Sequence, residues 1–510
     1  MALENKEYDF VIIGSGLGGL TCAYILAEEG YSVVVLEKNH QIGGNLQVFS
    51  RDKCIFDTGV HYIGSLDEGE NLNQFFKYLG LMDTLKWKRM DEDGFDVIRF
   101  DDGKEFKYAQ GYDRFIEVLS HEFPNEREVI ENYCKDIKET CTHFPLYNLK
   151  VEEGANYLKN ADLLSINAAE HIAAMTDNKL LRNVLGATNA LYAGDKNTTP
   201  WYVHALIINS YLTGSYRLQD GGSQIAIQMA KSIRKLGGQV LKRKEVVGVD
   251  YHDNGLVKNV NLKDGEKVFA KNFISNAHPA VTIDIFDEKR FLKPYVKRIK
   301  NLKNTPSSFI VHLVFKEDTF NYINHNIYQF VGDNDVWDVI DYEQSNWPKS
   351  YFVCTPASSK SEEFAEAMSV MTYMDYEETE KWEKTFNTVA QKGERGDEYE
   401  AFKKVKEERI ISLLEKQYPN IRSKIKAVYS STPLTYRDYI GDKTGSLYGI
   451  AKDSNNPLKT QINSKTKVKN LSLTGQNLVF HGVLGVTLGA FVTCFDFVDK
   501  HQLMNKVKNS

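Results

Sequence analysis

The fold of this chain is decided near its start by residues 8–19, YDFVIIGSGLGG. The short β-branched run predicts a strand, and it leads directly into glycines with GxGxxG spacing. The sequence then has helical character from Leu20 to Gly30, and Ser32–Leu36 predicts a second strand that ends at Glu37. This order of strand, glycine turn, helix, strand and acid predicts a βαβ unit that binds a dinucleotide.

Each position of this unit has an expected physical role. Gly14 allows the tight turn, Gly16 lets the backbone approach a pyrophosphate, and Gly19 lets the helix and strand pack closely. The pyrophosphate is expected at the helix N-terminus, because the free N–H groups there attract anions. Glu37 is expected to accept hydrogen bonds from ribose hydroxyls, and it disfavours an adenosine with a 2′-phosphate. Without the flanking strands and the acid, GxGxxG would indicate only a glycine-rich loop.

The composition is typical of a soluble globular protein with more than one domain. The chain has 510 residues, of which 42% are hydrophobic and 26% charged, with a formal net charge of −6. No domain has the basic excess that a nucleic-acid partner would require. The cysteines lack CxxC or metal-ligand spacing, so we expect no metal site, no disulfide framework and a reducing compartment. They are Cys22, Cys54, Cys134, Cys141, Cys354 and Cys494.

Three segments bear on localisation. Residues 1–6 are acidic and polar, so we expect no signal peptide. Leu478–Val498 is about long enough to span a bilayer, but its His481, Asp496 and spaced glycines predict a buried helix. The basic cluster 293–303 indicates a solvated helix face or, as an alternative, a membrane-docking surface. We therefore expect a cytoplasmic protein, either free or peripheral on a membrane face.

The nucleotide domain is resumed far along the chain. Asp220-Gly221-Gly222 precedes a predicted helix at Ile225–Leu236, and residues 246–275 predict a β-meander of a kind often inserted into flavin domains. Val468–Leu473 predicts a further strand. We predict a discontinuous nucleotide-binding domain of residues 1–70, 215–285 and 430–505. A substrate-binding domain is expected from residues 71–214 and 286–429.

Three motifs carry a more specific resemblance: DTGVHYIG at residues 57–64, TPLTYRDY at 432–439 and GSLYG at 445–449. With the N-terminal block and TGQN at 474–477, they resemble the FAD-dependent amine-oxidase-like superfamily. The resemblance is greatest to its branch of phytoene desaturase, carotenoid isomerase and all-trans-retinol 13,14-reductase (retinol saturase). It covers most of the chain. It implies an α/β fold, with a two-dinucleotide-binding-type (Rossmann-like) FAD domain and a mixed α+β substrate-binding domain.

The resemblance also implies an FAD site. Gly43 and Gly44 would border the flavin, and Tyr448 would lie beside the isoalloxazine. The family usually has an acid where Asn477 stands, so FAD binding is still expected but the ribitol contact stays open. The implied cofactor residues are Gly14, Gly16, Gly18, Gly19, Glu37, Lys38, Gly43, Gly44, Asn45, Val246, Tyr448, Gly475, Asn477 and Gly485.

The expected chemistry is that of the flavin. A flavin accepts or donates a hydride, and the protein supplies orientation, an apolar channel and a proton donor. We therefore predict an FAD-dependent oxidoreductase that saturates, desaturates or isomerises C=C bonds of a lipophilic polyene such as a retinoid, carotenoid or prenyl lipid. His61 and Tyr62 are the catalytic candidates for proton delivery, or else part of a loop that positions FAD. Tyr436 and Arg437 are candidates for substrate binding, or else pair with nearby acids.

Alternatives remain at this stage. Only one GxGxxG follows a strand and precedes a helix, so electrons would come from, or go to, a separate partner. An FAD-dependent amine oxidase would share the fold. A non-enzymatic prenyl-binding escort is disfavoured by the intact glycines and Glu37. An NAD-dependent dehydrogenase is disfavoured by the late glycine-rich helix and the interrupted domain.

Overall fold

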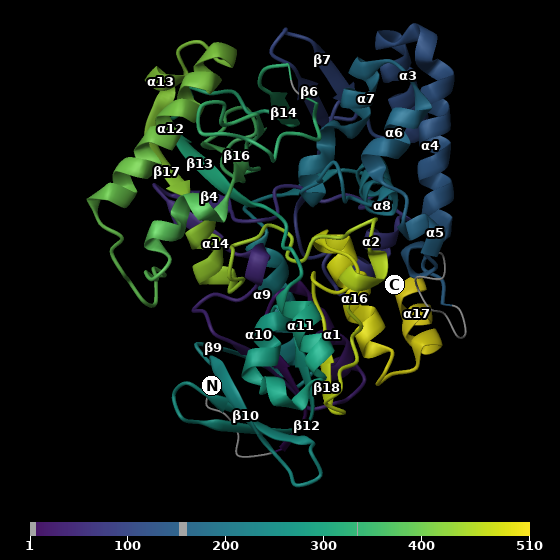
Figure 1. Cartoon of the computed structure of the whole chain (residues 1–510), viewed down its shortest axis with the longest axis vertical. Coiled ribbons are helices and arrows are strands. Elements are labelled where there is room, and N and C mark those ends of the chain that lie inside the picture. Colours follow the sequence, from purple (N-terminus) through teal and green to yellow (C-terminus); the bar gives the residue numbers. More distant parts are fainter. Residues whose placement is uncertain (1–6, 152–160, 334) are drawn as a thin grey trace.

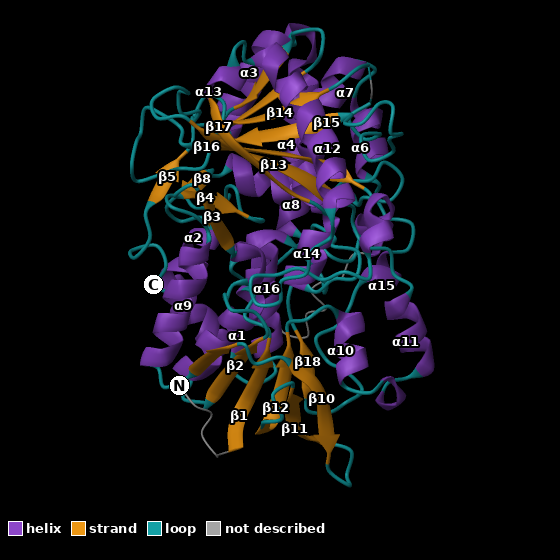
Figure 2. Ribbon diagram, turned by 90° about the vertical axis from the view of Figure 1, so that its left-hand side faces the viewer, coloured by secondary structure: helices purple, strands orange, loops and turns teal. Residues whose placement is uncertain are grey.

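Two seven-stranded sheets organise the chain and lie at opposite ends of the molecule (Figures 1 and 2). The computed structural model describes residues 7–151, 161–333 and 335–510. Residues 1–6, which bear on a signal peptide, lie outside the described residues. Within the described ranges, no helix is both long and apolar enough to cross a membrane.

The first sheet, at the lower end of Figure 2, has the order β10-β11-β12-β1-β2-β9, with β18 beside β12. The pairs β1–β2, β1–β12, β2–β9 and β12–β18 are parallel, whereas β10, β11 and β12 form the predicted antiparallel meander. The parallel strands therefore end at one edge, where the glycine turn follows β1. Their bounds are β1 (Glu7–Ile13), β2 (Val33–Glu37), β9 (Gln239–Lys242), β10 (Val246–Tyr251), β11 (Val257–Leu262), β12 (Lys267–Ser275) and β18 (Leu471–Leu473).

Helix α1 (Leu17–Glu28) packs against α9 (Ser223–Lys235) and α16 (Gly482–Cys494). It begins three residues before the predicted start because Gly16 is already its N-cap. Most of α1 is buried, since it lies between the sheet and α16. The apolar segment around α16 is a buried helix, as its glycines and polar residues predicted.

The second sheet has the order β17-β13-β16-β15-β14-β6-β7 and is antiparallel except for the β14–β6 pair. Helix α12 (Asp397–Gln417) and a group of helices that includes α4 and α8 surround this end of the molecule (Figure 1). The strands are β6 (Asp96–Arg99), β7 (Glu105–Tyr108), β13 (Ser307–Phe315), β14 (Asn326–Phe330), β15 (Ser350–Cys354), β16 (Ala367–Met374) and β17 (Ile425–Ser431).

The described ranges also contain four short strands outside these sheets and further helices. The short strands are β3 (Val48–Arg51), β4 (Cys54–Asp57), β5 (Trp87–Arg89) and β8 (Tyr216–Leu218). The remaining helices are α2 (Asn71–Tyr78), α3 (Tyr112–Glu122), α4 (Arg127–Thr142), α5 (Ala161–Leu164), α6 (Ala168–Met175), α7 (Lys179–Gly186), α8 (Trp201–Leu212), α10 (Pro279–Ile285), α11 (Lys293–Lys300), α13 (Ile421–Lys424), α14 (Pro433–Ile440), α15 (Pro457–Thr460) and α17 (Lys500–Lys508).

One buried arginine ties the second sheet to the segment that precedes α9. Arg217 in β8 donates to the carbonyl oxygens of Ile323 (2.6 Å) and His325 (2.9 Å) and to Asn326 Oδ1 (2.9 Å). These acceptors bind both terminal nitrogens of a guanidinium that is almost fully buried, whereas its Nε is buried without a hydrogen-bond partner. We propose that the domain boundaries follow the predicted ranges, in which residues 1–70, 215–285 and 430–505 belong to the nucleotide-binding domain.

Candidate functional site

The glycine turn between β1 and α1 forms one wall of a cavity. Gly14 has a φ of +92°, and a Cβ on Gly19 would lie 2.2 Å from the carbonyl oxygen of Gly14. A Cβ on Gly16 would lie 2.6 Å from Asn276 Nδ2. The positive φ of Gly14 and the close contact at Gly19 require glycine, and a side chain on Gly16 would displace Asn276. Glycine at these positions keeps the backbone of the turn free of side chains, as a bound anionic ligand requires.

Glu37 lies at the end of β2 on the same cavity. Its carboxylate accepts hydrogen bonds from Ser15 N (3.0 Å), Ser15 Oγ (2.6 Å) and Asn39 N (2.8 Å). A carboxylate offers about four lone-pair sites, so capacity remains for a ribose hydroxyl. The buried acid thus holds the turn in shape and still faces the cavity.

The cavity has a volume of about 370 Å³ and brings together most of the predicted cofactor residues. Those in its lining are Gly14, Gly16, Gly18, Glu37, Lys38, Gly43, Gly44, Asn45, Val246, Tyr448 and Asn477. Three others lie outside the lining: Gly19 packs α1 on β1, Gly475 contacts Asn276, and Gly485 lines a neighbouring pocket. The glycine turn, the acid and the other lining residues fit a dinucleotide such as FAD.

Asn477 holds the loop that carries Tyr448. Its Oδ1 accepts a hydrogen bond from Ile450 N (3.1 Å), and a Cβ on Gly449 would lie 2.1 Å from the same oxygen. An acceptor, rather than a negative charge, is what this contact needs, so an amide serves where the family usually has an acid. Tyr448 is thereby positioned in the cavity wall.

Two residues behind the glycine turn were missed by sequence reasoning. Asn276 and His278 follow β12 and line the cavity. The Asn276 side chain lies so close to Gly18 and Gly475 that a Cβ on either would come within 2.8 Å of its Oδ1. The available signal was their position directly after a strand, because residues after parallel strands gather at the ligand edge.

Tyr62 lies in the cavity lining and leads to a buried acid. Its hydroxyl donates to Asp96 Oδ2 (2.8 Å) and lies 2.7 Å from the hydroxyl of Tyr328. Asn326 Nδ2 donates to Asp96 Oδ1 (2.9 Å). Burial raises the pKa of Asp96 to about 7, against the lowering effect of these hydrogen bonds and of the Arg217 charge. Sequence reasoning missed Asp96, whose only signal was an acid inside an apolar strand.

His61 also lines the cavity, but it is unsuited to be an acid at neutral pH. Burial, together with the Arg217 charge, lowers the pKa of His61 to about 4. Its Nε2 is buried without a hydrogen-bond partner, and its ring lies 5.7 Å from that of Phe352. A neutral imidazole with a free nitrogen can position a ligand or accept a proton.

The two predicted substrate residues lie in different surroundings. Tyr436 lines the cavity and donates to the carbonyl oxygen of Thr58 (2.9 Å). Arg437 lies outside the lining and is bound to Asp438 Oδ1 (2.7 Å) and to the carbonyl oxygen of Glu383 (2.6 Å). Its guanidinium thus pairs with protein groups, which is the alternative that the sequence left open.

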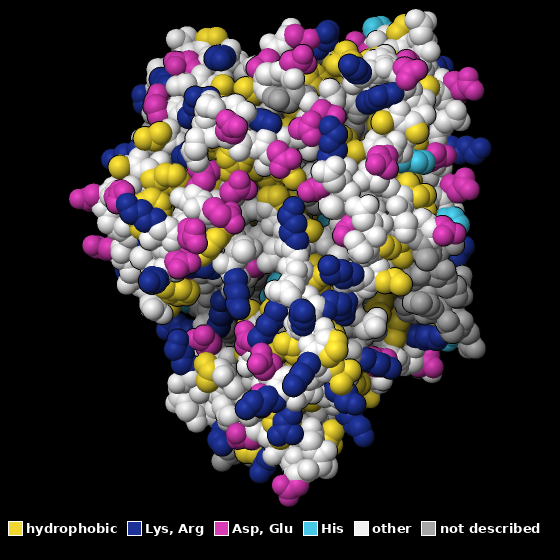
Figure 3. All heavy atoms as spheres, in the orientation of Figure 1, with side chains coloured by type: hydrophobic (Ala, Val, Ile, Leu, Met, Phe, Trp, Pro, Cys, Tyr) yellow, Lys and Arg dark blue, Asp and Glu magenta, His cyan; other side chains and the backbone are white. Residues whose placement is uncertain are grey.

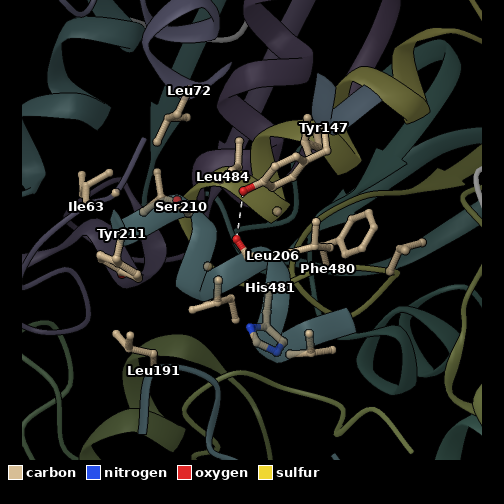
Figure 4. Close-up of a pocket in the computed structure, with 18 residues that line it drawn as sticks. Ile63, Leu72, Tyr147, Leu191, Leu206, Ser210, Tyr211, Phe480, His481 and Leu484 are labelled. Atoms are coloured by element: carbon tan, nitrogen blue, oxygen red, sulfur yellow. Dashed lines mark hydrogen bonds between the residues drawn. The ribbon is translucent and has the colours of Figure 1, made fainter. Parts of the chain in front are cut away.

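A second, mostly apolar pocket adjoins the cofactor cavity (Figure 4). The two share Leu191, Tyr211, Gly482 and Val483 in their linings. Within the pocket, Tyr147 donates its hydroxyl hydrogen to the carbonyl oxygen of Leu206 (2.9 Å). The other lining residues are Ile63, Gly64, Leu72, Val203, Ile207, Ser210, Val479, Phe480, His481, Leu484, Gly485 and Leu488. None of the described lining residues is an acid, a lysine or an arginine.

The family model of flavin-containing amine oxidoreductases matches residues 17–400, which is well over half of the chain. The chain belongs to this family. This flavin-containing oxidoreductase therefore uses FAD, and the predicted cofactor, enzyme class and α/β fold with a second mixed sheet are confirmed.

Individual relatives extend over nearly the whole of this oxidoreductase. An all-trans-retinol 13,14-reductase of Danio rerio is 27% identical and covers 96% of this chain and 85% of its own. A chloroplastic prolycopene isomerase of Daucus carota is 25% identical over 88% of this chain and 72% of its own. The cyclohexylamine oxidase of Brevibacterium oxydans shares the fold, with a TM-score of 0.61, 15% identity and coverage of 99% and 100%.

Proposed function

We propose that this oxidoreductase acts on C=C bonds of a lipophilic polyene. The observation that carries the proposal is the uncharged, mostly apolar pocket that adjoins the cofactor cavity and shares lining residues with it. A long apolar ligand gains roughly 25 cal/mol for each Å² of surface that it buries, whereas an ammonium substrate would lie in this pocket without a counter-ion. Support also comes from the relatives' names, a reductase of all-trans-retinol and an isomerase of prolycopene.

The protein side of the chemistry rests on Tyr62 and Asp96. FAD, when bound, supplies or accepts the hydride. Saturation of a C=C bond also needs one proton at the neighbouring carbon, and we propose that the Tyr62 hydroxyl delivers it. Asp96 in its protonated form then returns a proton to Tyr62 through their 2.8 Å hydrogen bond. Desaturation would use the pair in reverse, and isomerisation consumes no net proton.

We further propose a separate electron donor or acceptor and a peripheral membrane contact. Lys and Arg side chains gather over the lower half of the face in Figure 3, where Figure 1 places α10 and α11. In α11, Lys293 and Lys297 are exposed, and Leu292 just before the helix is 58% exposed. Exposed cations beside an apolar side chain favour contact with an anionic membrane surface, from which a lipophilic substrate could enter.

The test is anaerobic incubation of the flavin-loaded, dithionite-reduced protein with all-trans-retinol and with prolycopene, followed by product mass analysis. A gain of two hydrogen atoms means saturation, and unchanged mass with altered retention means isomerisation. With oxidised protein, a loss of two hydrogen atoms means desaturation. Rapid bleaching of the oxidised flavin by cyclohexylamine or putrescine, with both polyenes unchanged, would replace the proposal with amine oxidation.

A further inference from the structure

In the apolar pocket, the buried side chain of His481 has a polar atom without a hydrogen-bond partner. His481 is the N-cap residue of α16, yet its side chain makes no capping hydrogen bond. It is only 8% exposed, and its Nδ1 is buried without a hydrogen-bond partner. Figure 4 shows the imidazole in the pocket wall together with Leu191 and Leu206. A buried polar group without a partner is costly, so such a group in a ligand pocket points to a ligand that supplies the partner.

The other polar side chains in this wall are already engaged or lie at the boundary. Tyr147 donates to Leu206 O and accepts from Asn209 Nδ2 (2.8 Å). The hydroxyl of Ser210 accepts a hydrogen bond from Ser65 Oγ (3.0 Å). Tyr211 lines both the pocket and the cofactor cavity. His481 is therefore the buried group of the pocket that is best placed to bind a polar atom of a ligand.

The position of His481 also relates it to the cofactor. Its ring lies 5.0 Å from that of Tyr448, and the next residues, Gly482 and Val483, line both cavities. Burial, together with the nearby Lys452 charge, lowers the pKa of His481 to about 3, so the imidazole is neutral at physiological pH. A neutral imidazole has one donor and one acceptor nitrogen, which suits a hydroxyl or carbonyl oxygen better than an anion.

We propose that His481 binds the terminal oxygen of the substrate, so that the preferred substrate is a polyene alcohol or aldehyde rather than a polyene hydrocarbon. This inference rests on the proposed action on polyenes and names the class of polyene. A hydrocarbon in the pocket would leave the buried nitrogen of His481 without a hydrogen-bond partner. This unpaired polar group disfavours binding of the hydrocarbon relative to the alcohol or aldehyde.

The test measures equilibrium binding to the oxidised, flavin-loaded protein, by quenching of tryptophan fluorescence. The ligands are all-trans-retinol and the matching hydrocarbon, in which a methyl group replaces CH₂OH. We expect His481→Leu to weaken retinol binding about tenfold and leave hydrocarbon binding unchanged, whereas His481→Gln retains most of the retinol affinity. Phe480→Leu, a change in the same wall, is expected to weaken both ligands alike.

The outcomes separate the two proposals. If His481→Leu weakens both ligands equally, or neither, His481 is a packing residue and the inference fails while the polyene proposal stands. If the unmodified protein binds neither ligand, the polyene proposal itself fails. Flavin absorbance and the thermal unfolding midpoint of each variant identify any loss of fold. If the His481→Leu variant loses flavin, the affinities of the His481→Gln variant for retinol and for the hydrocarbon are compared instead, and this comparison tests the inference.

Discussion

The protonation state of Asp96 should determine how the reaction rate depends on pH. It must be protonated to return a proton to Tyr62, and its raised pKa of about 7 keeps it protonated below that pH. We expect the rate of polyene saturation to be constant below pH 7 and to fall about tenfold per unit above it. In Asp96→Asn the rate should fall roughly 100-fold and lose this inflection. The pH dependence is measured by single-turnover reoxidation of the reduced flavin by polyene, followed from pH 5 to 9.

Asp57 provides a matched control for this prediction. It is also buried and its pKa is also raised to about 7 by burial, but it accepts from Gly222 N (2.7 Å) instead of contacting Tyr62. Asp57→Asn should therefore keep the inflection near pH 7. If the inflection disappears in Asp57→Asn and persists in Asp96→Asn, the proton does not come by way of Tyr62 and Asp96.

Gly485 and Gly489 of helix α16 face different surroundings. A Cβ on Gly485 would lie 2.6 Å from Phe480 Cβ, whereas nothing lies within 4 Å of one on Gly489. We expect Gly485→Ala to cost about 1–3 kcal/mol, because the helix must move away from the loop that lines the apolar pocket. Gly489→Ala should be neutral or stabilising by up to about 1 kcal/mol, because alanine has the higher helix propensity.

Thermal unfolding midpoints of the two variants, measured with flavin bound, test this prediction for α16. The midpoint should fall in Gly485→Ala and stay or rise in Gly489→Ala. Equal midpoints would mean that α16 moves freely relative to the Phe480 loop. In that case the apolar pocket would not be shaped by this close contact.

At the scale of the whole molecule, the prediction concerns the membrane. Helix α11 contacts α15 through Arg298, which donates to the carbonyl oxygen of Lys459 (2.8 Å), and the two lie side by side in Figure 2. Leu458 in α15 is 71% exposed. Each cation near an anionic membrane contributes about 1 kcal/mol. Sedimentation with phosphatidylserine vesicles should thus show binding that weakens with salt.

The double variant Lys293→Glu/Lys297→Glu should bind these vesicles at least about tenfold more weakly. A control at two distant exposed lysines, Lys404→Glu/Lys416→Glu in α12, should bind like the unmodified protein. If the control loses binding as much as the α11 variant, attraction depends on total charge and the proposed contact through α11 is wrong.

The sequence by itself determined the cofactor end of this molecule. Residues 8–37 contain a complete βαβ unit, and its strand, glycine turn and helix depend on neighbouring residues, so local pattern was enough to predict them. The position of Gly14, Gly16 and Glu37 in one cavity follows from the same local geometry. The later glycine-rich blocks resembled a flavin domain because they keep the same kind of local turn chemistry.

Only the tertiary structure decided what surrounds the substrate. Asp96 meets Asn326 because β6 and β14 pair in parallel with these two residues in register, although 230 positions separate them. The apolar pocket likewise takes Leu72, Leu206 and Leu484 from three distant helices. No local pattern encodes such meetings, because they depend on long-range pairing and packing. The buried acid behind Tyr62 and the unpaired His481 therefore became visible only in the folded chain.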